Sequence, residues 1–218
     1  MASLPIRDQV KDHLLTPKNC ALAIIDYQPV QVNSIVSMDR QRLVDNIVAV
    51  ARIAKAYGLP IVVTTVNVKT GINKPLISQL RDVLGDIPTY DRTTINAWED
   101  KEFQAAIKAT GRKKLIMTAL WTEACLAYPA LDALKEDYEV YPVVDAVGGT
   151  SVEAHEAALR RIEQAGAKPI GWVQLICELQ RDWLRAETVP AFMDIFIQTG
   201  GTMGLQLTYD KDQASSTK

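Results

Sequence analysis

Three residues of this chain could together carry out nucleophilic catalysis on a carbonyl group. Asp26 directly follows the apolar run 21–25 (ALAII), Arg92 ends the segment 89–92 (TYDR), and Cys125 lies five residues past Leu120. A cysteine thiolate attacks carbonyl carbons, and Asp26 and Arg92 are charged residues that could stand at the same sheet edge. We therefore predict a site built around a cysteine nucleophile.

The residues around Cys125 predict how its thiol is activated. Thr122 is of a type that caps helix N-termini, which would place Cys125 in the first turn of a helix. The unpaired N–H groups and the positive end of the helix dipole lower the pKa of a thiol at such a position. The backbone N–H groups of Trp121 and Cys125 could then bind the oxyanion formed on the substrate. Pro129 should kink the helix just beyond the nucleophile.

Each of the three residues also has a purely structural interpretation. A buried cysteine is usually a small apolar core residue, a carboxylate at the end of a strand is often a cap, and an arginine is most often a surface cation. A catalytic interpretation is favoured because each of the three residues comes after an apolar segment, and these segments could end at one edge of a sheet. Glu123 could orient the turn beside Cys125 or simply stabilise a helix N-terminus.

The elements that must position these residues follow an alternating pattern. Short apolar runs predict buried strands, and periodic apolar stripes between them predict helices. Strands alternating with helices indicate right-handed crossovers and a parallel sheet, in which ligands bind beyond the carboxyl ends of the strands. We predict a three-layer α/β/α sandwich around a mostly parallel sheet. The predicted strands are 21–25, 60–66, 114–120, 138–144 and 167–175, with a short additional strand near 89–92.

Local signals set the limits of the predicted helices. Gly58 and Pro60 end the first long helix, Pro75 starts the next, and Thr150 with Glu153 forms a capping box that opens a helix running to about residue 165. A helical extension over about 187–210 carries bulky apolar side chains. Whether it closes the core or forms a subunit interface stays open. With no internal repeat or linker, residues 1–218 are expected to form a single domain.

Composition and charge exclude several classes of protein. The 218 residues carry a net charge of −2, which gives no basic surface for nucleic acid. No apolar run approaches the ~20 residues that span a membrane, and residues 1–17 lack the apolar core of a signal peptide. The three cysteines form no CxxC motif, which favours the reducing cytoplasm, and the two histidines form no metal-ligand cluster.

Several motifs resemble the isochorismatase-like cysteine hydrolases, a family that includes nicotinamidases and N-carbamoylsarcosine amidohydrolases. The resemblance spans about 19–183, and the fourth motif together with the C-terminal extension resembles the YcaC-like branch. It implies a Rossmann-like α/β/α fold and a homo-oligomer, a tetramer or octamer. The motifs are AIIDYQ (23–28), RTTINAW (92–98), LWTEAC (120–125) and CELQRDW (177–183).

The resemblance implies a triad of Asp, Lys and Cys. The Asp and the Cys fall on Asp26 and Cys125, and the Lys falls on Arg92, which can orient Asp26 but cannot relay a proton. The family also implies a cis peptide bond between Leu120 and Trp121. Family members usually have a small residue where this chain has Trp121, so the large ring should narrow the pocket or close one of its walls.

Two branches of the family fit this sequence poorly. Nicotinamidases use an Asp-x-His metal-ligand set after the second strand, whereas segment 66–71 reads VNVKTG and contains no histidine. The isochorismatase branch proper lacks the cysteine, so cleavage of a vinyl ether is also disfavoured. We therefore expect neither a catalytic metal nor a cofactor.

These observations predict a cysteine-dependent hydrolase that cleaves a small amide-, ureide- or imide-type C–N bond through a thioester. Two alternatives stay open: an inactive or weakly active oligomer with this fold, and a thiol-based redox protein. A nucleotide-binding protein is disfavoured because DYQP (26–29) follows the first strand where a glycine-rich turn is required. Candidate pocket residues, for each of which a packing or capping role is equally compatible, are Gln28, Asn96, Trp98, Thr122 and Tyr128.

Overall fold

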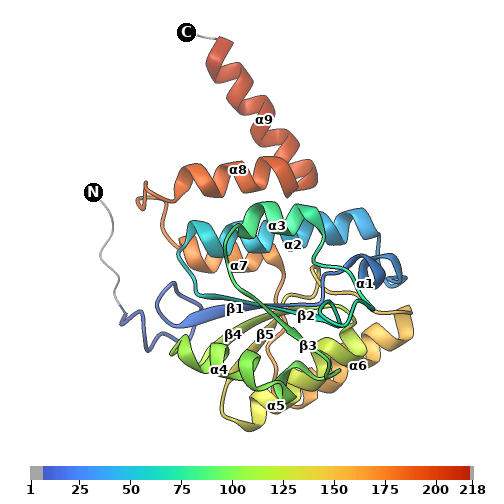
Figure 1. Ribbon diagram of the computed structural model, residues 1–218. Coiled ribbons are helices and arrows are strands. Elements are labelled where there is room, and N and C mark those ends of the chain that lie inside the picture. Colours follow the sequence, from blue (N-terminus) through green and yellow to red (C-terminus); the bar gives the residue numbers. More distant parts are fainter. Residues whose placement is uncertain (1–6, 217–218) are drawn as a thin grey trace.

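The computed structural model describes residues 7–216 and has a five-stranded parallel sheet at its centre (Figure 1). The strands lie in the order β3-β2-β1-β4-β5. Every residue of β1 and β4 is buried, as expected for central strands of a parallel sheet that is covered on both faces. The strands are β1 Cys20–Ile25, β2 Ile61–Val66, β3 Thr89–Arg92, β4 Lys114–Ala119 and β5 Glu139–Pro142.

Two layers of helices cover the sheet and confirm the predicted α/β/α sandwich. Side chains alternate along β1, so that Leu22 and Ile24 enter one hydrophobic core and Ala21 and Ala23 enter the other. The first core is closed by α1 Pro29–Asn33, α2 Arg40–Ala56, α3 Ser78–Leu84 and α7 Trp172–Gln180. The second is closed by α4 Lys101–Ala109, α5 Ala127–Lys135 and α6 Val152–Gln164 (Figure 1).

The register of the sheet brings three strand ends to one edge. Ile25, the last residue of β1, pairs with Thr64 of β2 and with Ala119, the last residue of β4. On the other side of β2, Val66 pairs with Arg92, the last residue of β3. Asp26, Arg92 and the segment that leads to Cys125 therefore leave the sheet at the same carboxyl edge.

The strand predicted over 167–175 is wrong. Its Ile170 forms only an isolated bridge with Val143, and helix α7 begins at Trp172. The apolar residues that indicated a strand are spaced three and four apart, so they form the buried face of a helix. The carboxylate of Asp145 accepts the Trp172 N–H at 3.0 Å, which stabilises this helix start from a distant part of the chain.

Two helices also begin at residues other than those predicted. Helix α3 begins at Ser78 rather than Pro75, because the N–H of Ile77 donates to the carbonyl of Tyr27 at 2.9 Å and holds the chain extended there. Helix α6 is capped by Ser151, whose hydroxyl accepts the Ala154 N–H at 3.1 Å, so the capping box predicted at Thr150 is wrong. The Thr150 hydroxyl has another partner, described below.

The C-terminal extension consists of two helices with different surroundings. Helix α8 (Val189–Thr199) packs on α2 and buries Phe192, Ile195 and Phe196, so it closes the core. Helix α9 (Gly201–Ser216) projects away from the body of the molecule and leaves Leu205 and Tyr209 exposed (Figure 1). No helix within residues 7–216 is both long and apolar enough to cross a bilayer.

Candidate active site

A buried ion pair between Asp26 and Arg92 forms the base of the site. Arg92 donates from Nη1 to Oδ1 of Asp26 and from Nη2 to Oδ2, each at 2.7 Å, and neither side chain is exposed to solvent. Such a two-pronged pair fixes the carboxylate in one orientation. Further bonds from Arg92 reach the Thr64 hydroxyl at 3.3 Å and the Ile95 carbonyl at 3.2 Å. Burial alone would lower the pKa of Arg92, but its bonds to Asp26 and the charge of that residue raise the pKa, so Arg92 stays protonated.

Asp26 occupies an uncommon backbone conformation. Its φ of 63° lies in the left-handed region, which few residues other than glycine adopt and in which Asp is among the tolerated types. The Asp26 N–H still continues the sheet by donating to the Thr64 carbonyl at 3.1 Å, and the Gln28 N–H donates to the Asp26 carbonyl at 2.8 Å. The chain thus turns sharply out of β1 at the residue whose carboxylate meets Arg92.

Cys125 lies on a single turn of π-helix, η2 (Thr122–Leu126), between β4 and α5. The peptide bond that precedes this turn, Leu120–Trp121, is cis, as the family resemblance implies. The Cys125 side chain is nearly enclosed, with 7% exposure. Its thiol lies near the Asp26 carboxylate and the backbone N–H of Trp121, close enough for both groups to shift its pKa. Short π-helical segments are frequent at functional sites.

The predicted lowering of the Cys125 pKa by a helix start is wrong for this structure. Burial raises the pKa of Cys125 to about 12, and the charge of Asp26 and the hydrogen bond to it act in the same direction. The Trp121 N–H and the positive charge of Arg92 favour the thiolate but do not outweigh these effects. The resting site therefore holds a neutral thiol beside the Asp26 side chain.

Contacts with the segment before α6 hold the π-turn in place. Thr122 is not the N-cap; Trp121 occupies that position, and the Thr122 hydroxyl bonds Nδ1 of His155 at 2.8 Å. The Thr122 N–H donates to the Gly148 carbonyl at 2.9 Å. Glu123 accepts from the Thr150 hydroxyl at 2.6 Å and from the Thr150 N–H at 3.0 Å. Glu123 therefore orients the turn, one of the two roles considered for it, while His155 and Thr150 were missed from sequence.

Two predicted pocket residues organise the backbone near the site. The amide group of Gln28 donates to the carbonyls of Val66 and Lys74 at 3.0 and 2.7 Å and accepts the Val66 N–H at 3.0 Å. Asn96 caps the 3₁₀ turn η1 (Ala97–Glu99) by accepting the Trp98 N–H at 3.0 Å. Both residues therefore have the capping role that the sequence left open beside a pocket role.

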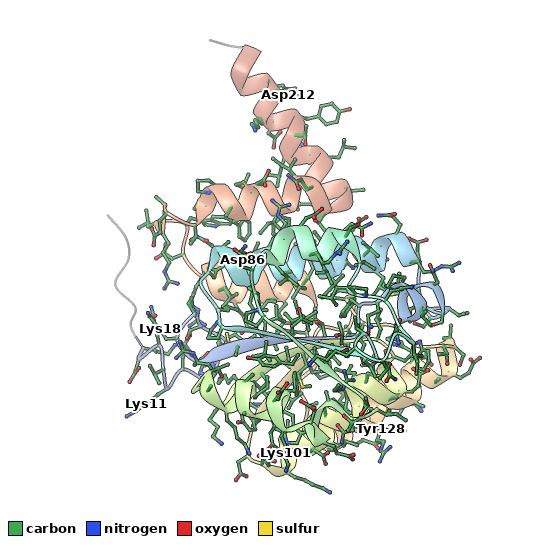
Figure 2. All side chains as sticks on the ribbon, viewed as in Figure 1. Lys11, Lys18, Asp86, Lys101, Tyr128 and Asp212 are labelled. Carbon is green, nitrogen blue, oxygen red and sulfur yellow. The ribbon has the colours of Figure 1, made fainter. Side chains whose placement is uncertain are left out.

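The aromatic candidates lie in different surroundings. Trp98 is buried against Phe103 and Tyr138, and its indole N–H donates to Glu136 at 2.8 Å, which is a packing role. Tyr128 on α5 is 40% exposed and points toward the surface (Figure 2). The indole of Trp121 packs against the core on the α1 and α2 side and donates to the Ser34 hydroxyl at 2.6 Å. This bond fixes the large ring beside the π-turn.

The other two cysteines are far from this arrangement. Cys20 begins β1, whereas Asp26 follows its end, so about 20 Å of extended chain separate Cys20 from Asp26, at ~3.3 Å per residue. Cys177 lies exposed on α7. Among the described residues, no group of three or more His, Cys, Asp or Glu side chains is placed to hold a metal ion.

Comparisons with known proteins place this geometry in a family. The isochorismatase domain matches residues 20–174. The probable hydrolase YcaC of Escherichia coli is 36% identical over 170 residues, which cover 78% of this chain and 81% of that protein.

Solved structures agree with this assignment. YcaC from Pseudomonas aeruginosa matches with a TM-score of 0.86 and 30% identity over 91% of this chain and 98% of that one. The E. coli YcaC structure, an octameric hydrolase of unknown specificity, matches with a TM-score of 0.85 and 32% identity over 92% and 98% of the two chains. The chain therefore belongs to the isochorismatase family of hydrolases and, within it, to the YcaC-like proteins.

Proposed function

We propose that this hydrolase cleaves a small amide-, ureide- or imide-type C–N bond through a thioester on Cys125. The observation that carries the proposal is the buried cluster of Asp26, Arg92 and Cys125, in which the thiol lies near the carboxylate and the carboxylate accepts from arginine with both oxygens. A carboxylate has about four acceptor positions, so the bonds to Arg92 leave room for the thiol proton.

The first half of the reaction forms the thioester. As the sulfur of Cys125 bonds to the substrate carbonyl carbon, its proton passes to Asp26 and the carbonyl oxygen becomes an oxyanion. Backbone N–H groups of Trp121 and Cys125 stabilise that oxyanion, a contribution of ~3 kcal/mol per donor in comparable sites. The C–N bond then breaks, and the leaving nitrogen takes the proton from Asp26.

The second half restores the enzyme. A water molecule gives a proton to Asp26 and attacks the thioester carbon, and the C–S bond breaks to release the acid. The sulfur regains its proton from Asp26. Arg92 remains protonated throughout and keeps the carboxylate oriented. This mechanism requires neither a metal nor a cofactor.

A structural neighbour supports a reactive nucleophile in this fold. The P. aeruginosa YcaC structure contains hexane-2,5-diol and covalent acrylamide. Acrylamide is an electrophile that alkylates thiols. It is therefore a suitable probe for Cys125 that does not depend on knowing the substrate.

A hydrolase screen over small amides, ureides and imides tests the proposal. We expect wild-type protein to release an amine or ammonia and to form an acyl adduct on the Cys125 peptide, detected by mass spectrometry. Cys125→Ala should lose both, with activity falling by at least ~10⁴-fold, whereas Cys177→Ser, the matched control, should retain both. Hydrolysis that persists in Cys125→Ala would overturn the proposal.

The same screen separates the alternatives. A thiol-based redox protein would consume peroxide without cleaving any C–N bond. An inactive member of the family would yield no acyl adduct even though Cys125 can be alkylated. The separation of Cys20 from the site argues against an internal disulfide with Cys125.

We also propose that the chain forms a homo-oligomer and works in the cytoplasm without nucleic acid. The octameric E. coli relative and the exposed apolar side chains of α9 support assembly. Light scattering on full-length protein and on a chain ending at Gly200 tests it. We expect the full chain to be a tetramer or octamer and the shortened chain to dissociate if α9 forms the interface; a full-length monomer would contradict the proposal.

A further inference from the structure

A cavity of about 480 Å³ lies at the amino end of the sheet, opposite the candidate active site. Four separate segments line it: the stretch before β1, the turn that leads into β4, the start of β5 and the turn before α7. Lys11 and Lys18 lie together at this end of the molecule, near the start of β1 (Figure 2). The lining residues are Val10, Lys11, Asp12, His13, Lys18, Asn19, Gly111, Arg112, Lys113, Lys114, Glu139 and Lys168.

Buried polar side chains hold one wall of the cavity in a fixed position. The ammonium group of Lys114, at the start of β4, donates to the carbonyls of Asp12 and His13 at 2.8 and 2.6 Å. The amide of Asn19 donates to the carbonyls of Asp12 and Leu14 at 3.1 and 2.9 Å. The segment before β1 is thus tied to the sheet, and the cavity has a preformed shape.

The cavity is strongly cationic although the whole chain is acidic. Six lysine or arginine residues line it against two acidic residues, an excess of four positive charges in a chain whose net charge is −2. Like charges brought together in a concave surface repel one another and concentrate anions from solution. A cation-lined cavity in an acidic protein is therefore a feature that needs a counter-charge.

The described residues supply only part of that counter-charge. Asp12 is already paired with Arg7 and Arg181, and Glu139 is paired with Lys168 and Lys114. Within residues 7–216, neither Lys11 nor Lys18 has an ion pair or hydrogen bond from its ammonium group. Nε of Arg112 is buried and lacks a hydrogen-bond partner in the same part of the chain. Buried donors are nearly always satisfied, and among the described residues Arg112 Nε is the buried donor without a partner that belongs to the lining of this cavity.

We propose that this cavity binds a small molecule through a diphosphate or triphosphate group. Several cations around one hollow match an anion that carries several charges on closely spaced oxygens, and guanidinium and ammonium groups are the usual partners of phosphate. Lys113 already lies over the Tyr138 ring at 4.5 Å and Lys168 over the Tyr141 ring at 5.5 Å. These aromatic faces are occupied, so recognition is of the phosphate chain rather than of a base.

The proposed site is separate from the hydrolase chemistry. It lies where β1 and β4 begin, and Asp26 and Cys125 lie beyond the points where the same strands end. Binding here should therefore not depend on the nucleophile. Cys125→Ala should bind phosphate compounds as the wild type does, so the proposal can fail or succeed independently of the proposed function.

Isothermal titration calorimetry with inorganic tripolyphosphate tests the site. We expect saturable binding that weakens with added salt and that is weaker by roughly tenfold or more in Lys18→Gln/Arg112→Gln, because the main charged donors are removed. ATP should bind about as tightly as tripolyphosphate. The matched control Lys101→Gln/Lys135→Gln removes two positive charges elsewhere on the surface and should bind normally.

Two results would overturn the proposal. One is the absence of saturable binding by wild-type protein. The other is equal weakening in the control variant, which would show attraction to overall charge rather than to the cavity. Circular dichroism and urea unfolding confirm that the variants are folded; all four substituted side chains lie at least partly at the surface.

Discussion

The two ends of the parallel sheet use charge in opposite ways. At the carboxyl end, Asp26 and Arg92 are fully enclosed and neutralise each other's charge through two bonds of 2.7 Å. At the amino end, cations surround a cavity, and Lys11 and Lys18 have no counter-charge among the described residues. The two ends belong to the same strands, so the difference lies in the loops that extend them.

The contrast distinguishes charges that are neutralised inside the protein from charges that are left for a ligand to neutralise. A charge removed from water must be paired inside the protein, which is why Asp26 and Arg92 occur together. In the proposed mechanism, the paired carboxylate then exchanges a proton with Cys125. Charges left unpaired at a hollow surface are instead available to a ligand.

Breaking the buried pair should have the largest effect. Arg92→Ala leaves the Asp26 carboxylate enclosed without its partner, and we expect the free energy of unfolding to fall by about 3–5 kcal/mol. Arg92→Lys keeps the positive charge but forms fewer hydrogen bonds. Its free energy of unfolding should therefore fall less than that of Arg92→Ala, and it should retain partial hydrolase activity. Urea unfolding measures both. A change of less than about 1 kcal/mol in Arg92→Ala would mean that the pair is unimportant for stability.

Removing the buried cation at the other end should cost less. Lys114→Met keeps the length and apolar stem of the side chain but leaves the carbonyls of Asp12 and His13 without their donor. We expect the free energy of unfolding to fall by about 2–3 kcal/mol, the value for hydrogen bonds to a charged group. Tripolyphosphate binding should weaken as well, since the cavity wall is released. If Lys114→Met binds tripolyphosphate as tightly as the wild type and unfolds at the same urea concentration, Lys114 does not hold the cavity wall.

The tie between the π-turn and α6 should have a smaller effect. Thr122→Val removes the hydroxyl that bonds His155 while keeping the shape of the side chain. We expect a loss of ~1 kcal/mol in stability and slower alkylation of Cys125 by acrylamide. Thr122→Ser, which keeps the hydroxyl, serves as the control and should alkylate at nearly the wild-type rate. Equal rates of Cys125 alkylation in Thr122→Val and wild type would exclude a positioning role for the Thr122 hydroxyl.

Much of this architecture could be predicted from sequence, because it depends on local patterns. The apolar runs located β1, β2, β4 and β5, and parallel strands must end at a shared edge, which brings Asp26, Arg92 and Cys125 near one another. The run at 167–175 misled because a buried helix and a buried strand are both apolar, and the cap from Asp145 that decides between them is remote in sequence.

What could not be predicted depends on burial and on contacts between distant segments. The sign of the Cys125 pKa shift follows from enclosure of the thiol beside Asp26, which a helix N-terminus in the sequence does not reveal. His155 comes from α6, and its spacing in the chain gives no link to Thr122. The cationic cavity collects lysines from three segments, each of which alone resembles an ordinary surface residue.

The pH dependence of Cys125 alkylation tests whether enclosure beside the Asp26 carboxylate keeps the thiol protonated in the resting site. Burial, the Asp26 charge and its hydrogen bond raise the pKa of Cys125 to about 12, while the charge of Arg92 lowers it. Asp26→Asn removes the carboxylate and leaves Arg92 as a partner for the thiolate. The pKa should therefore fall, and alkylation at neutral pH should accelerate by at least ~10-fold, the effect of one pKa unit.

The measurement is the rate of acrylamide alkylation against pH for wild type and Asp26→Asn, both carrying Cys177→Ser to remove the exposed thiol. We expect faster alkylation in Asp26→Asn together with complete loss of hydrolysis. Without the carboxylate, more of Cys125 is thiolate, but the proposed proton acceptor is gone. An alkylation profile that stays unchanged, or that moves to higher pH in a correctly folded variant, would contradict it.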